Sequence, residues 1–281
     1  MNDHEIFPRT CVGGVSLPRL LVGTNWLLGW SHTSLAKDDF IREYQTRPRI
    51  VAMLKVFLEY GIDAVMAPLS SYLDDSICEV EQQTGQKVTR IYTPAFDLNP
   101  DAASTERAEA VFDRCAALGA TFCMPHQSVT DALLDRRAGL IRDLDQYTRM
   151  IRERGMIPGL STHMPETVVY TDRMEADVET YIQIYNSAGF LMQVEADWVM
   201  KIIREAKKPV MTIKPLAAGR ILPVVGLAFV WNTIRDRDMV TIGTTTPAEA
   251  REVIELSLDF LNRRFPANKL QETRSKKSLQ K

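Results

Sequence analysis

The sequence predicts an α/β protein, a single (β/α)8 barrel of the TIM-barrel class. From residue 47 onward, helical apolar patterns alternate with short β-branched runs, which indicates a parallel sheet with right-handed crossovers. Glycines follow several of the helical patterns, as expected at helix ends. Eight strand–helix units are present, enough to close the sheet into a barrel. A doubly wound open sheet is the alternative.

The first half of the chain is expected to form strands at its short apolar runs and helices at its amphipathic ones. Ile50, Met53, Leu54 and Phe57 recur at helical spacing, and Gly61 follows them as a stop signal. The expected strands are 20–23, 64–67, 87–93 and 121–126. The expected helices are 47–60, 72–84, 104–118 and 140–154.

The second half repeats this alternation with clearer helix starts. Pro165, Pro223 and Pro247 each begin a helical pattern, where the missing N–H removes no intrahelical hydrogen bond. Asp197 is expected to cap a helix here, as Ser104 is in the first half. The expected strands are 156–160, 178–185, 209–213 and 239–242. The expected helices begin at residue 165 or span 197–206, 223–234 and 247–261.

The segment 25–46 is unusually long for a loop of this fold. It leaves the end of the barrel at which barrel enzymes bind their ligands. Long loops in this place are usually lids or interface pieces, and Trp26 and Trp30 are candidates to cover a ligand. Trp198 and Trp231 lie in helical patterns and are expected to be packing residues.

The loops after the last two expected strands predict an anion site. Residues 211–220 and 239–247 each combine a β-branched run with a loop of small residues, and a helix follows each loop. Small residues let backbone N–H groups approach an anion, and a helix N-terminus adds partial positive charge. Barrels of this class commonly hold a phosphate at this place, so a phosphorylated ligand is expected.

Bulk properties restrict the classes of partner. The formal net charge of −2 gives no electrostatic case for nucleic acid or an anionic membrane. No apolar run approaches the roughly 20 residues of a membrane span. The polar, acidic N-terminus has the wrong chemistry for a secretory signal. The expected partner is therefore a small molecule, and the expected location is cytoplasmic.

Composition also sets the expected domain boundaries. A chain of 281 residues suits one barrel domain, expected at residues 1–265. Residues 266–281 are polar and charged, and this tail is expected to be disordered. The four cysteines, Cys11, Cys78, Cys115 and Cys123, have no metal-site spacing and are expected to be buried, reduced thiols. None of these features fixes the oligomeric state.

Four short motifs follow the expected strands five to eight: GLSTHMPE at 159–166, QIYN at 183–186, KPLAAG at 214–219 and IGTTTPAE at 242–249. In this order and spacing they resemble the motifs of the aldo-keto reductase superfamily. The resemblance covers roughly residues 50–260 and is weaker in the first half. It implies the barrel fold, and it implies reduction of a carbonyl compound by NADPH bound in an extended form across the strand ends.

The resemblance also implies which residues would bind this cofactor. Ser161 and Thr162 would face the nicotinamide amide, with Gln183 near it. Leu216, Ala217 and Gly219 would flank the pyrophosphate. The adenosine phosphate would meet the strand-eight loop and an arginine in the next helix: Gly243, Thr244, Thr245, Thr246 and Arg251. Threonine hydroxyls and backbone N–H groups suffice for a phosphate, and a nearby arginine would strengthen its binding.

The catalytic tetrad of the family, Asp, Tyr, Lys and His, is largely lost. Met66 stands in place of the aspartate, and Tyr72 lies one position after that of the tyrosine. Pro94 replaces the lysine, and only His126 matches. Hydride transfer to a carbonyl needs a proton donor. Without the two charged neighbours, Tyr72 should keep a pKa of about 10 and donate slowly at neutral pH.

A second group of polar residues lies at the same end of the barrel. His126 and His163 follow strands four and five, Lys214 follows strand seven, and His32 lies in the long first segment. Histidines are suited to acid–base chemistry at neutral pH, and a histidine pair with a carboxylate can bind a metal ion. Glu195, Glu166 and Asp97 are conceivable third ligands. Lys214 is a candidate for Schiff-base chemistry with a carbonyl substrate.

Three functions follow from these observations. The first is an NADP(H)-dependent oxidoreductase of a small carbonyl compound, with a divergent site in which His126, Tyr72, Lys214 and His163 are the catalytic candidates. The second is an acid–base or metal-assisted lyase, isomerase or hydrolase that uses His126, His163 and Lys214. The third is a barrel that binds a small ligand without catalysis, because tetrad loss is also expected of an inactive relative.

Overall fold

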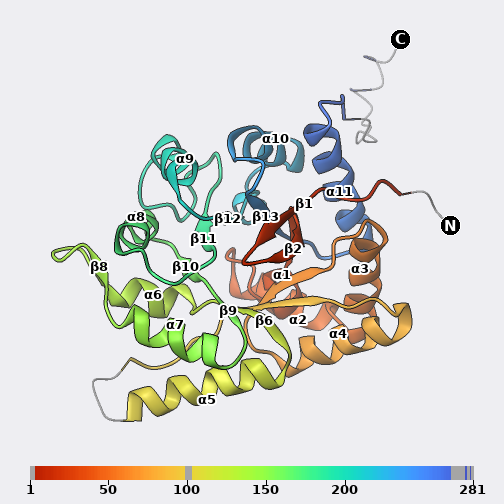
Figure 1. Cartoon of the computed structure of the whole chain (residues 1–281). Coiled ribbons are helices and arrows are strands. Elements are labelled where there is room, and N and C mark those ends of the chain that lie inside the picture. The colour runs from red at the N-terminus through yellow and green to blue at the C-terminus, as the bar shows by residue number, and fades with distance from the viewer. Residues whose placement is uncertain (1–3, 99–102, 267–275, 277–278, 280–281) are drawn as a thin grey trace.

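The computed structural model describes residues 4–98, 103–266, 276 and 279, and this part of the chain forms the expected barrel (Figure 1). All strand pairings within the barrel sheet are parallel. In chain order the barrel strands are β3 (Leu20–Gly23), β4 (Ala64–Ala67), β5 (Thr89–Tyr92), β6 (Ala120–Cys123), β9 (Ile157–Pro158) with β10 (Leu160–Thr162), β11 (Tyr181–Ile184), β12 (Val210–Ile213) and β13 (Met239–Gly243).

The sheet closes through the fifth barrel strand, which is split at Gly159. Its first half, β9, pairs with β6, and its second half, β10, pairs with β11. A Cβ atom at Gly159 would lie 2.7 Å from Met124 Cε and 2.8 Å from the Thr180 carbonyl oxygen. Only glycine fits this close approach, so the residue that interrupts the strand also allows it to join its two neighbours.

Helices surround the barrel on the outside (Figure 1). Their apolar faces pack against the outward side chains of the strands and form the larger core, which includes Phe57, Tyr92, Phe112 and Tyr185. The helices after the strands are α3 (Arg47–Glu59), α4 (Ser71–Thr84), α5 (Ala103–Ala117), α6 (Gln127–Leu133), α7 (Leu144–Glu153), α8 (Pro165–Met174), α9 (Ala196–Glu205), α10 (Pro223–Thr233) and α11 (Pro247–Leu261).

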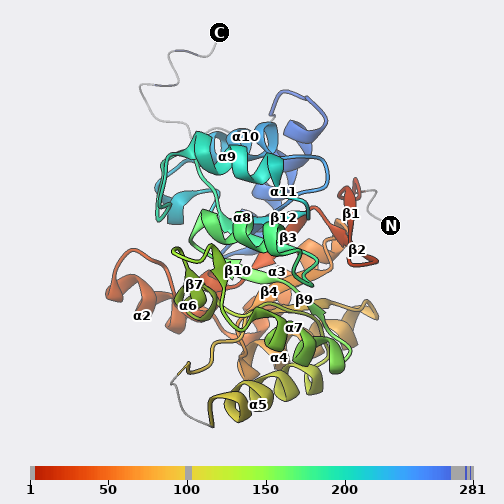
Figure 2. The ribbon, with the colours of Figure 1, turned by 60° about the vertical axis from the view of Figure 1, so that its left-hand side comes forward.

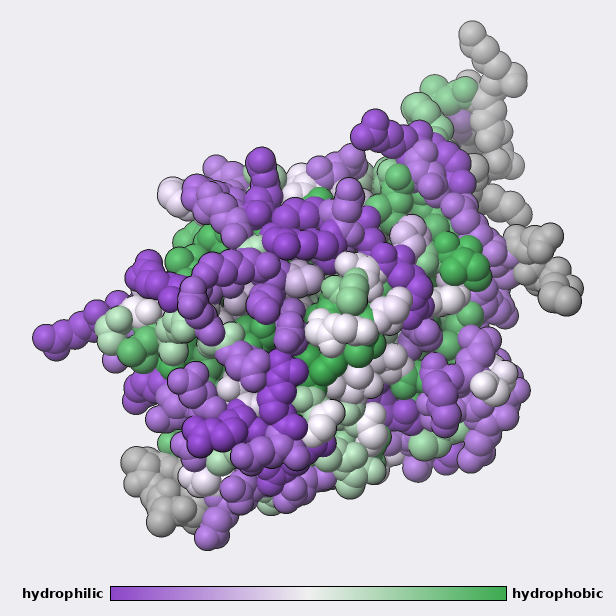
Figure 3. All heavy atoms as spheres, in the orientation of Figure 1, coloured by the Kyte–Doolittle hydropathy of each residue, from purple (hydrophilic) through white to green (hydrophobic). Residues whose placement is uncertain are grey.

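A second core fills the barrel interior. Inward side chains such as Met66, Phe122 and Met211 form it. Val12 and Leu17 extend it at the end of the barrel where the strands begin. These two residues belong to a hairpin of β1 (Arg9–Val12) and β2 (Val15–Pro18), which the sequence reading missed. The hairpin lies in front of the barrel in Figure 1, and in Figure 3 hydrophilic residues predominate around that face.

The opposite end of the barrel carries α1 (Asn25–Leu28) and α2 (Leu35–Tyr44), and α2 projects from the barrel in Figure 2. The expectation of one long loop at 25–46 was therefore wrong. Gln45 fastens the segment, because its side-chain amide donates to the carbonyl oxygens of Trp26 (3.2 Å) and Thr245 (2.9 Å). These contacts are between residues far apart in sequence, which local pattern does not reveal.

Several other boundaries differ from the predictions. The expected helix 140–154 begins only at Leu144, because 140–141 forms β8 (Leu140–Ile141), paired with β7 (Leu134–Asp135). Ser104 lies inside α5 rather than at its cap. Asp197 lies in the first turn of α9, one position inside the helix start. The remaining strands and helices match their predicted ranges within a few residues.

Burial corrects two further expectations. Cys115 and Cys123 are buried, but Cys11 and Cys78 are exposed. Trp231 packs in the core, whereas Trp198 is 56% exposed and is not a core residue. The tail that was expected to be disordered lies largely outside the described residues, and the single-domain boundary stays a prediction. In the described part of the chain, no helix has the length and apolar character needed to cross a membrane.

Candidate functional site

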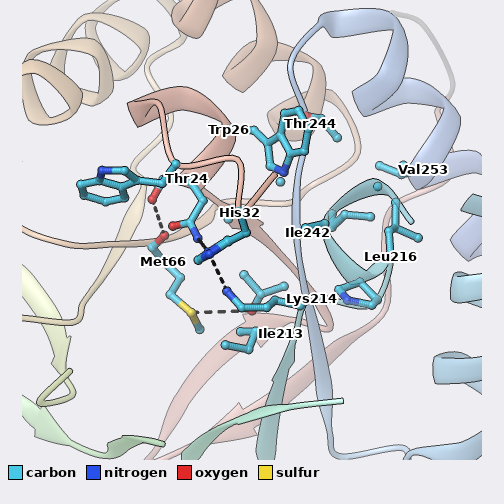
Figure 4. Close-up of a pocket in the computed structure, with 18 of the residues that line it drawn as sticks. Thr24, Trp26, His32, Met66, Ile213, Lys214, Leu216, Ile242, Thr244 and Val253 are labelled. Carbon is cyan, nitrogen blue, oxygen red and sulfur yellow. Dashed lines mark hydrogen bonds between the residues drawn. The ribbon is translucent and has the colours of Figure 1, made fainter. Parts of the chain in front are cut away.

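A cavity of about 660 Å³ opens at the carboxyl ends of the barrel strands (Figure 4). Its walls come from the exits of β3, β4, β6, β10, β12 and β13, and from α1 with the turn after it. Many of the residues singled out in the sequence contribute to it: His126, Ser161, His163, Lys214, Leu216, Gly219, Gly243, Thr244 and Thr245, together with Trp26, Trp30 and His32. This is the end at which barrel enzymes bind substrates.

Lys214 supplies the cation of the cavity. It directly follows β12, and its φ of 59° is in the left-handed region that L-residues rarely adopt. Its Nζ donates to His32 Nε2 at 3.0 Å (Figure 4). Burial lowers the pKa of Lys214 to about 8, and no carboxylate among the described residues opposes this shift. The ammonium therefore stays mostly protonated at pH 7 but loses its proton at a lower pH than an ordinary lysine.

His32 receives hydrogen bonds at one nitrogen from two donors. Lys214 Nζ and Asn25 Nδ2 lie 3.0 and 3.1 Å from Nε2, so Nε2 is the acceptor and the neutral ring carries its proton on Nδ1. Burial lowers the pKa of His32, and the nearby Lys214 lowers it further. The turn is held by Asp38, which accepts from the Ser31 N–H (2.7 Å) and hydroxyl (2.6 Å).

His126 lies at the exit of β6 and caps α6 with its side chain. Its Nδ1 accepts from the Ser128 N–H at 3.3 Å and lies 2.9 Å from the Ser128 hydroxyl. Because a backbone N–H only donates, Nδ1 is the acceptor and the neutral ring carries its proton on Nε2. Burial lowers the pKa of His126, and the charge of Lys214 lowers it further.

His163 lies at the exit of β10, the neighbouring wall of the cavity. Burial lowers its pKa to about 4, with further lowering by Lys214, His126 and His32. Asp131 of α6 fixes this loop, because it accepts from the His163 N–H at 3.1 Å. His163 is therefore neutral at pH 7, and burial favours the neutral form of His32 and His126 as well.

Several predicted site residues do not reach the cavity. Tyr72 is 43% exposed, its hydroxyl donates to the Gln45 carbonyl oxygen at 3.0 Å, and it does not line this cavity. Arg251 instead faces Tyr60 and Glu59, with nitrogens 3.4 and 3.5 Å away. Thr246 caps α11 by accepting from the Glu249 N–H.

Three further predicted cofactor contacts are buried in the protein. The Thr162 hydroxyl donates to Asp131 at 2.5 Å, which fixes the loop before α8. Gln183 is fully buried within β11 and is not a lining residue. Ala217 is likewise fully buried, within the loop that follows β12. None of these three residues lines the cavity, although their motifs lie at the ends of the barrel strands.

The predicted anion corner is lined by an indole ring and two carboxylates. A Cβ at Gly243 would lie 3.1 Å from the Trp26 ring, and one at Gly219 would lie 4.0 Å from it, so both glycines face the indole. The Thr245 N–H donates to the Glu249 carboxylate at 2.7 Å. Glu249 and Glu252 both line this side of the cavity. Two carboxylates disfavour a phosphate here, contrary to the prediction for the strand-eight loop.

The sequence reading missed Asn25, Asp131 and Glu249 as site residues. Glu249 had a usable signal, since Thr246 and Glu249 have the spacing of a capping box, which places the carboxylate beside the free N–H groups of the helix. The metal-assisted alternative also loses support. Within the described residues, no three His, Cys, Asp or Glu side chains are placed to hold a metal ion. Glu166, one conceivable ligand, pairs with Arg136 at 2.6 Å.

Comparison with known proteins supports the fold assignment. No protein-family model matches the chain, and no curated protein matches it. A Pseudomonas aeruginosa protein assigned to the aldo-keto reductases has a TM-score of 0.67 and 13% identity, over 93% of this chain and 98% of its own. An aldo-keto reductase from Brucella melitensis has a TM-score of 0.57 at 10% identity, over 93% and 96% of the two chains. This chain therefore has the fold of the aldo-keto reductases.

More distant enzymes share the same architecture. An aldose reductase from Giardia lamblia has a TM-score of 0.53 and 14% identity, over 89% of this chain and 94% of its own. The alignments span nearly whole chains on both sides, so the likeness extends over the complete barrel. Identities this low establish the fold, and the chemistry must be argued from the side chains at the cavity.

Proposed function

We propose that the chain is an enzyme that acts on a small carbonyl compound, with Lys214 and His126 binding and protonating the carbonyl oxygen. One observation carries the proposal: the Lys214 ammonium faces the cavity with His32 as its hydrogen-bond partner and without a neighbouring carboxylate to neutralise it. An ammonium has three donors, so donors are left for an electron-rich oxygen of the ligand. Apolar walls, which include Ile213 and Leu222, suit a small organic molecule.

The protonation states at the mouth suit acid–base work. Lys214, with a pKa of about 8, is close to the value at which a group both donates and accepts protons at neutral pH. His126 offers its Nε2–H as a neutral donor, since Nδ1 is occupied by the cap of α6. A developing negative charge on a carbonyl oxygen would therefore meet one cation and one neutral N–H donor.

Oxidoreduction is the reaction class that the shared fold supports. NADP(H) is the cofactor that the resemblance implies, and Ser161 lines the cavity where the nicotinamide amide is expected. The other half of the cofactor does not fit. Trp26, Glu249 and Glu252 line the corner that the adenosine phosphate would need, and the two carboxylates would repel it. Binding of the carbonyl oxygen and proton transfer therefore fall to Lys214 and His126 of this chain.

An isomerase or lyase is the second candidate. It is favoured by His126 and His163, which lie on neighbouring walls, close enough that His126 contributes to the lowered pKa of His163. Such groups can remove a proton next to a carbonyl whose oxygen is bound by Lys214. This reaction needs no nicotinamide, so it agrees with the poor fit of the phosphate corner.

One experiment tests the proposal and separates the two classes. Small aldehydes and ketones are incubated with the protein in D₂O, with and without NADH or NADPH, and followed by NMR. Alcohol formed only with a nicotinamide indicates oxidoreduction, and deuterium exchange next to the carbonyl without it indicates isomerase or lyase chemistry. If no compound reacts while several bind, the chain is the non-catalytic ligand-binding barrel, and the proposal is overturned.

A further inference from the structure

We propose that Lys214 forms a Schiff base with the carbonyl carbon of its ligand, which makes this lysine a covalent catalytic residue. The inference rests on the proposed function for the class of ligand, a small aldehyde or ketone. It goes further because the amine becomes a nucleophile instead of a proton donor. Covalent capture by lysine requires an uncharged amine in a sheltered cavity, with donors that assist the departure of the carbonyl oxygen.

The surroundings of Lys214 meet the first requirement. The residue is largely shielded from solvent, and its Nζ faces a cavity lined by Trp30 and Ile213. No ion pair with a carboxylate holds the proton on Nζ within the described residues, and burial lowers the pKa to about 8. About one tenth of the lysine is then uncharged at pH 7, against well under one thousandth for an ordinary surface lysine.

The backbone supplies an independent argument. Lys214 and His32 both have left-handed backbone conformations, with φ of 59° and 57°, although neither is glycine. L-residues rarely adopt this conformation, because it brings Cβ close to the following carbonyl oxygen. These two strained residues meet each other, since Lys214 Nζ lies 3.0 Å from His32 Nε2. Among the described residues, six other non-glycine residues share this conformation, including Ala217 and Ala218 of the same loop, so the feature specific to this pair is that its side chains meet at one amine.

The step balances without an added reagent. The uncharged Nζ attacks the carbonyl carbon, a C–N bond forms, and the C=O electron pair moves to oxygen. The His126 Nε2–H donates a hydrogen bond to that oxygen, and the proton lost by the nitrogen passes through His32 Nε2 or solvent to the oxygen, which gives a carbinolamine. A proton from solvent then lets the hydroxyl leave as water while the C=N bond forms, and the resulting iminium returns one proton to solvent. One carbonyl compound and one amine thereby give one imine and one water, with no change of oxidation state.

The test is reductive trapping in the full chain. The protein is incubated with glycolaldehyde or pyruvate and sodium cyanoborohydride, and the labelled residue is located by peptide mass analysis. The expected result is a single adduct on Lys214, formed at least tenfold faster than on any other lysine. The rate should rise with pH up to about 8 and then level off, with His32, His126, His163, Glu249 and Glu252 as the other titratable groups around the cavity.

Two matched variants make the result decisive. Lys37→Met removes a lysine near Trp26, outside the cluster, and should leave the trapping unchanged. Lys214→Arg keeps a positive charge but cannot form an imine, so it should lose trapping while retaining some ligand binding. Label spread evenly over surface lysines, or full turnover by Lys214→Arg, would overturn the inference.

The trapping experiment also separates this inference from the proposed function. If carbonyl compounds react with the wild-type protein but no adduct forms on Lys214, the proposed function stands and covalent capture falls. If neither reaction, binding nor trapping occurs, both fall. The peptide analysis uses wild-type protein, so a variant that fails to fold does not remove the test.

Discussion

The loops after β12 and β13 lie on the same wall of the cavity and look alike in sequence, yet they carry opposite charges. The β12 loop presents the Lys214 ammonium, and the β13 side presents the carboxylates of Glu249 and Glu252. Small residues in both loops do give close packing, but Trp26 occupies the space beside both Gly219 and Gly243. Small-residue loops therefore indicate a close approach between the backbone and another group. Here that group is the Trp26 side chain, whereas the sequence predicted a bound anion.

Removal of the Lys214 ammonium should have the largest effect on activity. Lys214→Met should lower kcat/KM for any carbonyl substrate by about 10²–10⁴-fold, the range typical of a positioned acid–base group. Steady-state kinetics with purified protein would measure it, and circular dichroism would check the fold. A loss below about threefold would show that Lys214 is a bystander in the cavity.

Stability should reveal the same buried cation. The pKa of Lys214 is about 8 in the folded chain and 10.5 in its ordinary state, so between these values the unfolded chain holds a proton that the folded chain has released. Stability should therefore rise by up to about 3 kcal/mol from pH 8 to 10.5. Urea unfolding of wild type and Lys214→Met across this window would measure the difference. Parallel curves for the two proteins would contradict the assigned pKa.

Removal of the carboxylates on the β13 side should have a smaller effect, on the affinity for anions. Glu252→Gln removes one carboxylate from the β13 side, and Glu249→Gln removes the other while weakening the contact with the Thr245 N–H. Each change should tighten the binding of inorganic phosphate or NADPH several-fold, because one exposed charge is worth about 1 kcal/mol. Fluorescence titration at low salt would measure it. Unchanged or weaker binding in both variants would mean that the carboxylates do not repel anions.

Tyr72 provides the smallest expected effect and a control for the whole scheme. Its hydroxyl donates to Gln45 outside the cavity, so Tyr72→Phe should change kcat/KM by less than about twofold. The lost hydrogen bond should cost about 0.5–1.5 kcal/mol of unfolding free energy. Kinetics and urea unfolding on one preparation measure both. A drop in activity comparable with that of Lys214→Met would restore Tyr72 as a proton donor.

Sequence pattern was sufficient for the barrel itself. The apolar runs and the turn residues that flank them located β3, β4, β12 and β13, because buried parallel strands are continuous apolar segments that end at turn residues. It failed for α1, which is four residues long, has no side-chain cap and depends on the distant contacts of Gln45. Short elements fixed by tertiary contacts have no local signature to read.

The site was predictable only as far as strand ends determine it. His163 and Lys214 directly follow barrel strands, His126 lies three residues past the end of β6, and each lines the cavity. Thr162 and Gln183 also belong to strands of matching motifs, but their side chains are buried within the protein. Whether a residue lies at the mouth depends on strand position, whereas whether it faces the cavity depends on its rotamer and partners, such as Asp131 for Thr162.

The β1–β2 hairpin restricts how ligands enter and leave the barrel. Val12 and Leu17 pack into the interior core and close the end of the barrel opposite the cavity. A compound that binds at Lys214 is therefore expected to enter and leave through the same cavity opening, past Trp26 and Trp30. Arriving and departing molecules should consequently exclude one another, so accumulated product is expected to slow the uptake of fresh substrate in a competitive manner.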